Sequence, residues 1–125
     1  MPKRSRPSSR EPEGAGERGA ATVLGAFLAA VLLTVTVALT AVASAVVARH
    51  RAQAGADLAA LAAALMLPEG SAPACGQAAT VLRSMRIPLA DCAVEGLDVI
   101  VTATVPVRLG RWQLGTARAG ARAGP

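Results

Sequence analysis

The dominant pattern in the chain is an uninterrupted apolar stretch near the N-terminus. No charged residue and no proline occurs from Ala20 to Ala48. An α-helix rises about 1.5 Å per residue, so roughly 20 apolar residues cross the hydrocarbon core of a bilayer. The stretch is longer than this, so the helix must tilt or project from the membrane. We therefore predict a transmembrane helix over residues 19–48.

Two other structures compete for this stretch. A buried helix of a soluble protein is disfavoured, because the rest of the chain is too short to cover a helix that is apolar all round. A cleaved signal peptide would have an apolar region of about 7 to 15 residues before a small-x-small triplet. Ala43, Ser44 and Ala45 form such a triplet deep inside the stretch. A retained anchor is favoured, and a secreted product beginning near Val46 is the alternative.

The basic residues on either side of the stretch predict its orientation. Two cations follow it at once, Arg49 and Arg51, together with His50. Five precede it: Lys3, Arg4, Arg6, Arg10 and Arg18. The side richer in Lys and Arg normally stays in the cytoplasm. We expect a single-pass protein of the cell membrane, with residues 1–18 as a disordered basic cytoplasmic tail and the C-terminal part extracytoplasmic.

Helix-forming sequence continues beyond the apolar stretch. Ala and Leu dominate residues 49–67 and Pro68 follows, which predicts a helix extension outside the membrane. Leucines recur at spacings of three and four, at Leu58, Leu61 and Leu65, and predict an apolar face. Gln53 and Asp57 stand one helical turn apart and form a polar pair.

The remaining sequence predicts a small domain over residues 68–115. After a turn at 68–73 we expect a short helix at about 75–85 and a short strand around 92–94. Residues 98–109 alternate between apolar and polar side chains, which indicates a half-buried strand. Pro106 predicts that this is an edge strand or that its pairing ends there. A last short strand is expected at 112–114, and the Ala-, Gly- and Arg-rich tail, 116–125, is expected to be disordered.

Composition favours lipid as the place where much of the apolar surface is buried. Hydrophobic residues make up 53% of the 125 residues, yet there is one Phe, one Trp and no Tyr, whereas soluble cores usually draw on aromatic side chains. The chain has 13 Lys and Arg against 8 Asp and Glu. These cations are spread along the chain without an aromatic platform for bases, so we expect no nucleic acid as a partner.

The two cysteines, Cys75 and Cys92, predict a disulfide. An even pair of cysteines outside the cytoplasmic membrane normally oxidises. The bridge would tie the second helix to the first short strand and contribute about 3 kcal/mol through the chain entropy of the unfolded state. Two unpaired buried thiols are the alternative.

The sequence contains no pattern that indicates catalysis, a cofactor or a metal. His50 has no nearby Ser or Cys partner, and there is no CxxC pair, phosphate loop or dinucleotide fingerprint. The acids Asp91, Glu95 and Asp98 lie close in sequence, but such a cluster is usually solvated. We expect a non-enzymatic protein without a small-molecule substrate. Pairs of small residues four apart predict self-association through the helix: Gly25/Ala29, Ala26/Ala30 and Ala41/Ala45.

Residues 18–64 resemble the TadE/TadG-like proteins of Flp (Tad) pilus assembly. The resemblance rests on Arg18-Gly19 before the apolar helix, on a basic exit, and on a Gln-x-x-Ala-Asp-x-Ala-Ala-Leu-Ala segment from Gln53 to Ala62. The cysteine pair and the late strand resemble the smaller, TadE-like members. The implied fold is α+β, with a long N-terminal pilin-like transmembrane helix followed by a small extracytoplasmic domain of a short helix and a few antiparallel strands.

The resemblance implies a pseudopilin-like or minor-pilin-like component that works with other Tad-like pilus or secretion subunits. Some members are cut by a prepilin peptidase, and the junction here would be Gly19/Ala20. Pilins carry Glu at the fifth position after the cut, where this sequence has Leu24, so a permanent anchor is the alternative. Gln53 and Asp57 would contact a neighbouring subunit, unless Asp57 is only a solvated acid. The alternative function is an accessory or regulatory single-pass protein that binds a membrane enzyme or transporter.

Overall fold

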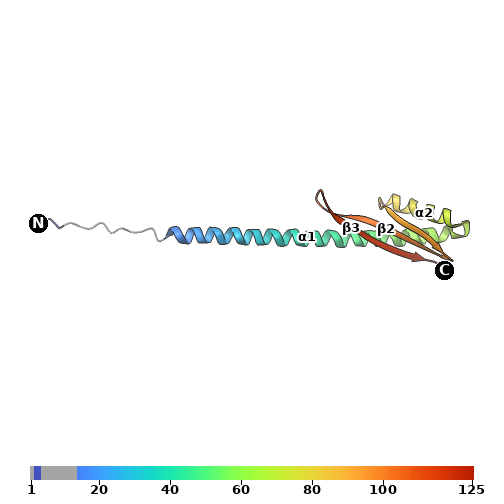
Figure 1. Ribbon diagram of the computed structural model, residues 1–125, viewed down its shortest axis with the longest axis horizontal. Helices are drawn as coiled ribbons and strands as arrows, with labels where there is room; N and C mark the ends of the chain where they lie inside the picture. The colour runs from blue at the N-terminus through green and yellow to red at the C-terminus, as the bar shows by residue number, and fades with distance from the viewer. Residues whose placement is uncertain (1, 4–13) are drawn as a thin grey trace. The chain divides into compact units, whose positions relative to one another are not determined.

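The computed structural model describes residues 2–3 and 14–125 (Figure 1). The elements are helix α1 (Gly14–Met66), a 3₁₀ turn η1 (Leu67–Glu69), helix α2 (Ser71–Ser84) and strands β1 (Leu89–Glu95), β2 (Asp98–Leu109) and β3 (Trp112–Ala123). A long apolar helix is therefore followed by a small domain with a short helix and three antiparallel strands, which confirms the predicted fold class. The chain divides into two units, Met1–Val37 and Ala38–Pro125.

Helix α1 joins the two predicted helical segments and begins earlier than expected. Its first turns include residues that were assigned to the disordered tail, namely 14–18, so that part of the prediction is wrong. Glu17 lies in the first turn, where a carboxylate stabilises the positive end of the helix dipole, and the Thr22 hydroxyl donates to the Arg18 carbonyl. Of the rest of the expected tail, Pro2 and Lys3 have no regular structure, and residues 1 and 4–13 lie outside the described residues.

The second helix also begins earlier than predicted. Helix α2 starts at Ser71, so Pro73 lies in its first turn, where the missing N–H has no helical partner to lose. At the other end Arg86 has a φ of 57°, the N–H of Arg86 donates to the Arg83 carbonyl, and that of Ile87 donates to the Leu82 carbonyl. This hydrogen-bond pattern is a Schellman cap. It reverses the chain after α2 and directs it into β1.

The three strands form one antiparallel sheet in the order β1-β2-β3. Each connection is a two-residue turn that opens with a glycine of positive φ, Gly96 at 64° and Gly110 at 58°. Two-residue hairpin turns whose twist matches that of the strands favour glycine at this position. Strand β2 is consequently the central strand, and its two neighbours are the strands that precede and follow it in the sequence.

Two predictions about the sheet need correction. The tail expected to be disordered from Thr116 is the second half of β3, which pairs with β2 from Trp112 to Ala123. Its inward positions are small (Ala117, Ala119, Ala121, Ala123) and alternate with Thr, Arg and Gly, so they fit closely under the helices. The predicted edge position of β2 is also wrong for the strand as a whole.

Pro106 nevertheless lies where β2 is locally an edge. The Thr104 N–H donates to the Pro88 carbonyl, on the β1 side, and backbone N–H groups two residues apart point the same way in a strand. At Pro106, the position that an N–H would occupy therefore points past the start of β1, where β1 no longer pairs with β2. On its other side Pro106 stays in register with Thr116.

The core of the second unit consists of small side chains. One face of β2 is buried along its length, as the alternation predicted: Val99, Val101, Ala103, Val105 and Val107. Apart from Gly55, the buried residues of α1 are all alanines: Ala48, Ala52, Ala56, Ala59, Ala60 and Ala63. Helix α2 adds Ala74, Ala78 and Leu82. Since only one face of the sheet is buried, α1 and α2 share that face, and the alanines let α1 lie close to it.

Candidate assembly surfaces

The leucines of α1 face away from this core. Leu58, Leu61 and Leu65, which we call the leucine face, are 52%, 60% and 77% exposed. The predicted apolar face therefore exists, but it does not pack inside the domain, because the alanines on the other side of the helix take that role. An exposed row of leucines at helical spacing is a surface that other helices can cover.

An apolar groove borders the leucine face at the end of the domain. It has a volume of about 640 Å³ and lies between the C-terminal end of α1, the β1–β2 turn and the end of β3. The lining residues are Leu61, Ala64, Leu65, Leu67, Pro68, Leu97, Ala123, Gly124 and Pro125. None of these side chains is charged, so the groove suits an apolar segment rather than a polar ligand.

The polar pair next to the leucine face is formed within α1 itself. The Gln53 Nε2 atom donates to Asp57 Oδ1 at 2.9 Å, and both residues are exposed. One carboxylate oxygen thus has an intrahelical partner, while the side chain remains accessible. The pair stands where a neighbouring subunit on the leucine face could also reach it.

The two cysteines form the predicted disulfide. Cys75 in α2 and Cys92 in β1 are bridged, with their Cα atoms 5.9 Å apart. Cys92 pairs with Val101 of the central strand, so the bridge fastens α2 to the buried face of the sheet. The alternative of two free thiols is excluded in this structure.

The close approach of α1 to α2 depends on Gly55. A Cβ atom at this position would lie 2.7 Å from Cδ1 of Ile87 and 3.1 Å from Cδ2 of Leu82. Arg51 strengthens the same contact, because its Nη2 donates to the Met85 carbonyl at 3.0 Å. Sequence analysis missed both contacts, since they join residues at least 27 positions apart.

Residues of the predicted helix–helix contact in lipid are exposed in the first unit. A Cβ atom on Gly25 would meet nothing within 4 Å, and the same holds for Gly19 at the predicted peptidase junction. The most apolar window of the helix has no buried residue. Threonines do not interrupt this surface, because the hydroxyls of Thr34 and Thr36 donate to the carbonyls of Ala30 and Leu32.

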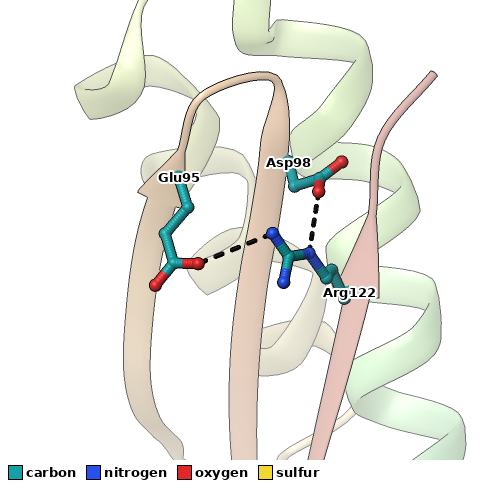
Figure 2. A network of polar contacts seen from close by, with 3 residues as sticks. All are labelled: Glu95, Asp98 and Arg122. Atoms are coloured by element: carbon teal, nitrogen blue, oxygen red, sulfur yellow. Dashed lines mark hydrogen bonds and ion pairs between the residues drawn. The ribbon is translucent and has the colours of Figure 1, made fainter.

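The clustered acids bind an arginine from the segment that was expected to be disordered. Figure 2 shows Arg122 of β3 between Glu95 and Asp98: its Nε donates to Asp98 Oδ2 at 2.8 Å, and its Nη2 lies 3.5 Å from Glu95 Oε2. These side chains are all more than one third exposed, so the network fixes the end of β3 at a modest energy, about 1 kcal/mol or less. Period-two alternation in 116–123 was the signal that could have revealed it.

No group of three or more metal-ligating side chains occurs among residues 2–3 and 14–125. His50 is exposed on α1. The features that the described part of the chain does present are surfaces for packing: an exposed apolar helix, the leucine face and its groove.

Residues 19–66 match the family described as putative Flp pilus-assembly TadE/G-like. The matched region covers α1 from Gly19 to its last residue, which confirms the resemblance found in the sequence. The match supports a pilus-related component. A helix long and apolar enough to cross a membrane is present near the N-terminus, as a single-pass protein requires.

One curated relative comes from Mycobacterium tuberculosis (strain ATCC 25618 / H37Rv) and is named apoptosis inhibitor Rv3654c. It is 61% identical to this chain over 54 residues, which are 43% of this chain and 64% of the relative. The aligned part therefore spans less than two thirds of that protein. No solved structure matches the chain.

Proposed function

We propose that this protein is a non-enzymatic, single-pass membrane subunit, pseudopilin-like or minor-pilin-like, of a Tad/Flp-type pilus or related secretion apparatus. The observation that carries the proposal is that two sides of α1, the helix that matches the family, have different environments. Its alanines hold the small domain, while the leucine face and the apolar stretch stay exposed for other subunits. In this proposal the N-terminus lies in the cytoplasm and the domain outside, as the basic residues before the apolar stretch predict.

The mechanism follows from these two surfaces. The apolar stretch of α1 is held in the bilayer by the transfer of its large side chains into lipid. Beyond the bilayer the leucine face and the adjoining groove accept an apolar helix of a neighbouring subunit. Gln53 and Asp57 border this contact, where a cation of the neighbour would fix its register.

Site-specific photo-crosslinking in the native envelope tests the assembly role. A photoreactive residue at Leu61, on the leucine face, should capture pilus or secretion subunits of the Tad type or a second copy of this chain. The matched control is Gln77, which is exposed on α2 away from α1's leucines, and it should capture neither. Capture of a membrane enzyme or transporter from Leu61 would establish the accessory function instead. Equal products from both positions would contradict the proposal.

The Asp57→Asn variant tests the proposed polar contact. Loss of co-purification with the partner found at Leu61, with retained folding, supports a register contact through the carboxylate. Unchanged co-purification assigns Asp57 to solvent and leaves Gln53 as its only partner.

Processing at Gly19/Ala20 is a separate proposal. The intact mass of the protein from the membrane fraction decides it: a mature chain beginning at Ala20 establishes cleavage by a prepilin peptidase. A chain that retains its N-terminal residues makes α1 a permanent anchor, in keeping with Leu24 where pilins have Glu.

Thiol labelling in intact cells tests the orientation. A membrane-impermeant reagent should label Cys75 and Cys92 only after the bridge is reduced. Thiols that react without reduction, and only after the cells are opened, would place the domain in the cytoplasm.

A further inference from the structure

The hairpin of β2 and β3 extends along α1 towards the apolar stretch. Leu97, at the start of β2, shares a groove with Leu61, and Val107 shares another with Ala45 and Arg49. About ten strand residues thus run antiparallel to about sixteen helix residues. The turn at Gly110, a few residues further, consequently reaches the level of about residues 40–42 of α1. Figure 1 shows this turn projecting beyond the rest of the sheet.

That level belongs to the apolar stretch, near its end. The stretch from Ala20 to Ala48 exceeds the roughly 20 residues that cross the hydrocarbon core by about nine. If the core is crossed by its first 20 residues, residues 40–48 lie in the headgroup region. The hairpin turn then lies at the same depth as this surplus part of α1.

The side chains around the turn are of the kind that the headgroup region favours. Trp112 is 70% exposed and Leu114 is 54% exposed, and both lie at the start of β3, next to the turn. Trp is enriched at membrane–water interfaces, where its apolar ring and its N–H both find partners.

Exposed arginines surround the same end of the domain. We call them the basic rim: Arg49, Arg51, Arg83, Arg86, Arg108, Arg111 and Arg118. The Arg51–Met85 hydrogen bond brings the end of α2 to the level of Arg51 on α1, and Arg118 lines a pocket together with Arg49. No Asp or Glu occurs within residues 38–51, 79–90 or 104–118, the segments that form this end. The ion pairs among the described residues all involve Arg122, at the opposite end of β3.

We propose that the tip of the β2–β3 hairpin inserts into the headgroup region of the bilayer that α1 spans, with Trp112 and Leu114 in the interface and the basic rim bound to the phosphates of anionic lipids. The partner is thus a lipid surface. The proposal rests on the membrane anchoring of α1. It gives the domain a second attachment, so that the helix and the hairpin together fix its height above the bilayer.

Depth-dependent quenching of Trp112 tests this directly, because it is the only Trp in the chain. The full-length protein is reconstituted in phosphatidylcholine vesicles with and without phosphatidylglycerol. Lipids that carry a quencher near the headgroup should reduce Trp112 emission at least about twofold more than lipids quenched deep in the acyl chain. Acrylamide, an aqueous quencher, should act more weakly than on the protein in urea.

The basic rim is tested with the double variant Arg108→Gln/Arg111→Gln. Its shallow quenching in phosphatidylglycerol vesicles should fall to the level of the unaltered protein in phosphatidylcholine alone. Arg122→Gln is the control: it removes one positive charge, against two in the double variant, from the distal end of β3, and it should leave the quenching unchanged. An intact disulfide in each variant verifies that the domain has folded.

A second reporter separates this proposal from the anchoring of α1. In the variant Trp112→Phe/Leu32→Trp the Trp lies on α1, and deep quenchers should act on it most strongly. Deep quenching of this reporter together with water-exposed Trp112 would overturn the hairpin proposal alone. Loss of lipid quenching at both positions would overturn the membrane anchor itself. A Trp112 shielded from acrylamide but untouched by lipid quenchers would assign the tip to a protein contact and overturn the proposal.

Discussion

The two parts of α1 use similar apolar residues in opposite ways. In the first unit, large side chains such as Phe27 and Leu32 are 63% and 67% exposed, and alanines lie between them. In the second unit, the alanines of α1 that face the sheet, such as Ala56, are buried, and the leucines of α1 stay exposed. Apolar content alone therefore does not tell which solvent a helix segment occupies. The difference lies in what the adjoining sequence provides, because only the second part has a sheet and a helix to pack against.

The largest effect is expected from a charge placed in the apolar stretch. Leu32→Arg should reduce membrane-bound protein strongly, because Arg at the centre of a membrane helix costs about 3 kcal/mol. Leu97→Arg is the control, since Leu97 in the β1–β2 turn is also 67% exposed but lies outside the bilayer in the proposed arrangement. Membrane fractionation measures both. Equal losses would show that the two leucines share one environment, contrary to the comparison.

Removal of the disulfide should affect only the second part of the chain. The double variant Cys75→Ser/Cys92→Ser should lower the free energy of unfolding of the small domain by about 3 kcal/mol, because the unfolded chain is no longer cross-linked. Denaturant unfolding followed by Trp112 fluorescence measures this loss. Membrane retention should be unchanged, and a variant that leaves the membrane would show that α1 is not an independent anchor.

A larger side chain on the alanine face should separate the two sides of α1. Ala56 is fully buried, so Ala56→Leu should destabilise the domain by about 1–3 kcal/mol through overpacking. Ala54→Leu adds the same atoms at an exposed position of the same helix and should change stability by less than about 0.5 kcal/mol. Thermal unfolding of the two variants gives the contrast. Similar melting temperatures would mean that the alanine face is not closely packed.

The smallest effect is expected at the arginine network. Arg122→Ala removes two ion pairs that are open to solvent, so the domain should lose about 1 kcal/mol or less. Salt should weaken the contribution further, because it screens exposed charges. Unfolding at low and high ionic strength measures it. A loss above about 2 kcal/mol would place the end of β3 among the essential parts of the fold.

The predictions from sequence succeeded where a pattern was long or chemically specific. The apolar stretch, the alternation of β2 and the cysteine pair each gave the observed element, because period, length and oxidation chemistry constrain them locally. The failure at residues 116–123 has a physical origin. Ala and Gly have low strand propensity, and their strand forms because the sheet beside it supplies hydrogen bonds and a close-fitting surface.

The candidate surfaces were predicted less completely. The leucine face was recognised, but its exposure depends on the alanines that pack behind it, and the choice between the two sides of α1 is made by the sheet. The contacts of Gly55 with Ile87 and of Arg122 with Asp98 join distant parts of the chain. Such contacts depend on the reversal at Arg86 and on the pairing of β3, which no local pattern specifies.

The core is built largely of alanine and valine, so most substitutions in it can only enlarge a side chain. Almost every substitution at Ala52, Ala59 or Ala63 adds volume to a space that is already filled, and very few can leave a cavity. Random change at this surface therefore acts by pushing α1 away from the sheet. Selection on the domain should then keep these positions small while the leucine face, which is free of that constraint, can diversify with its partners.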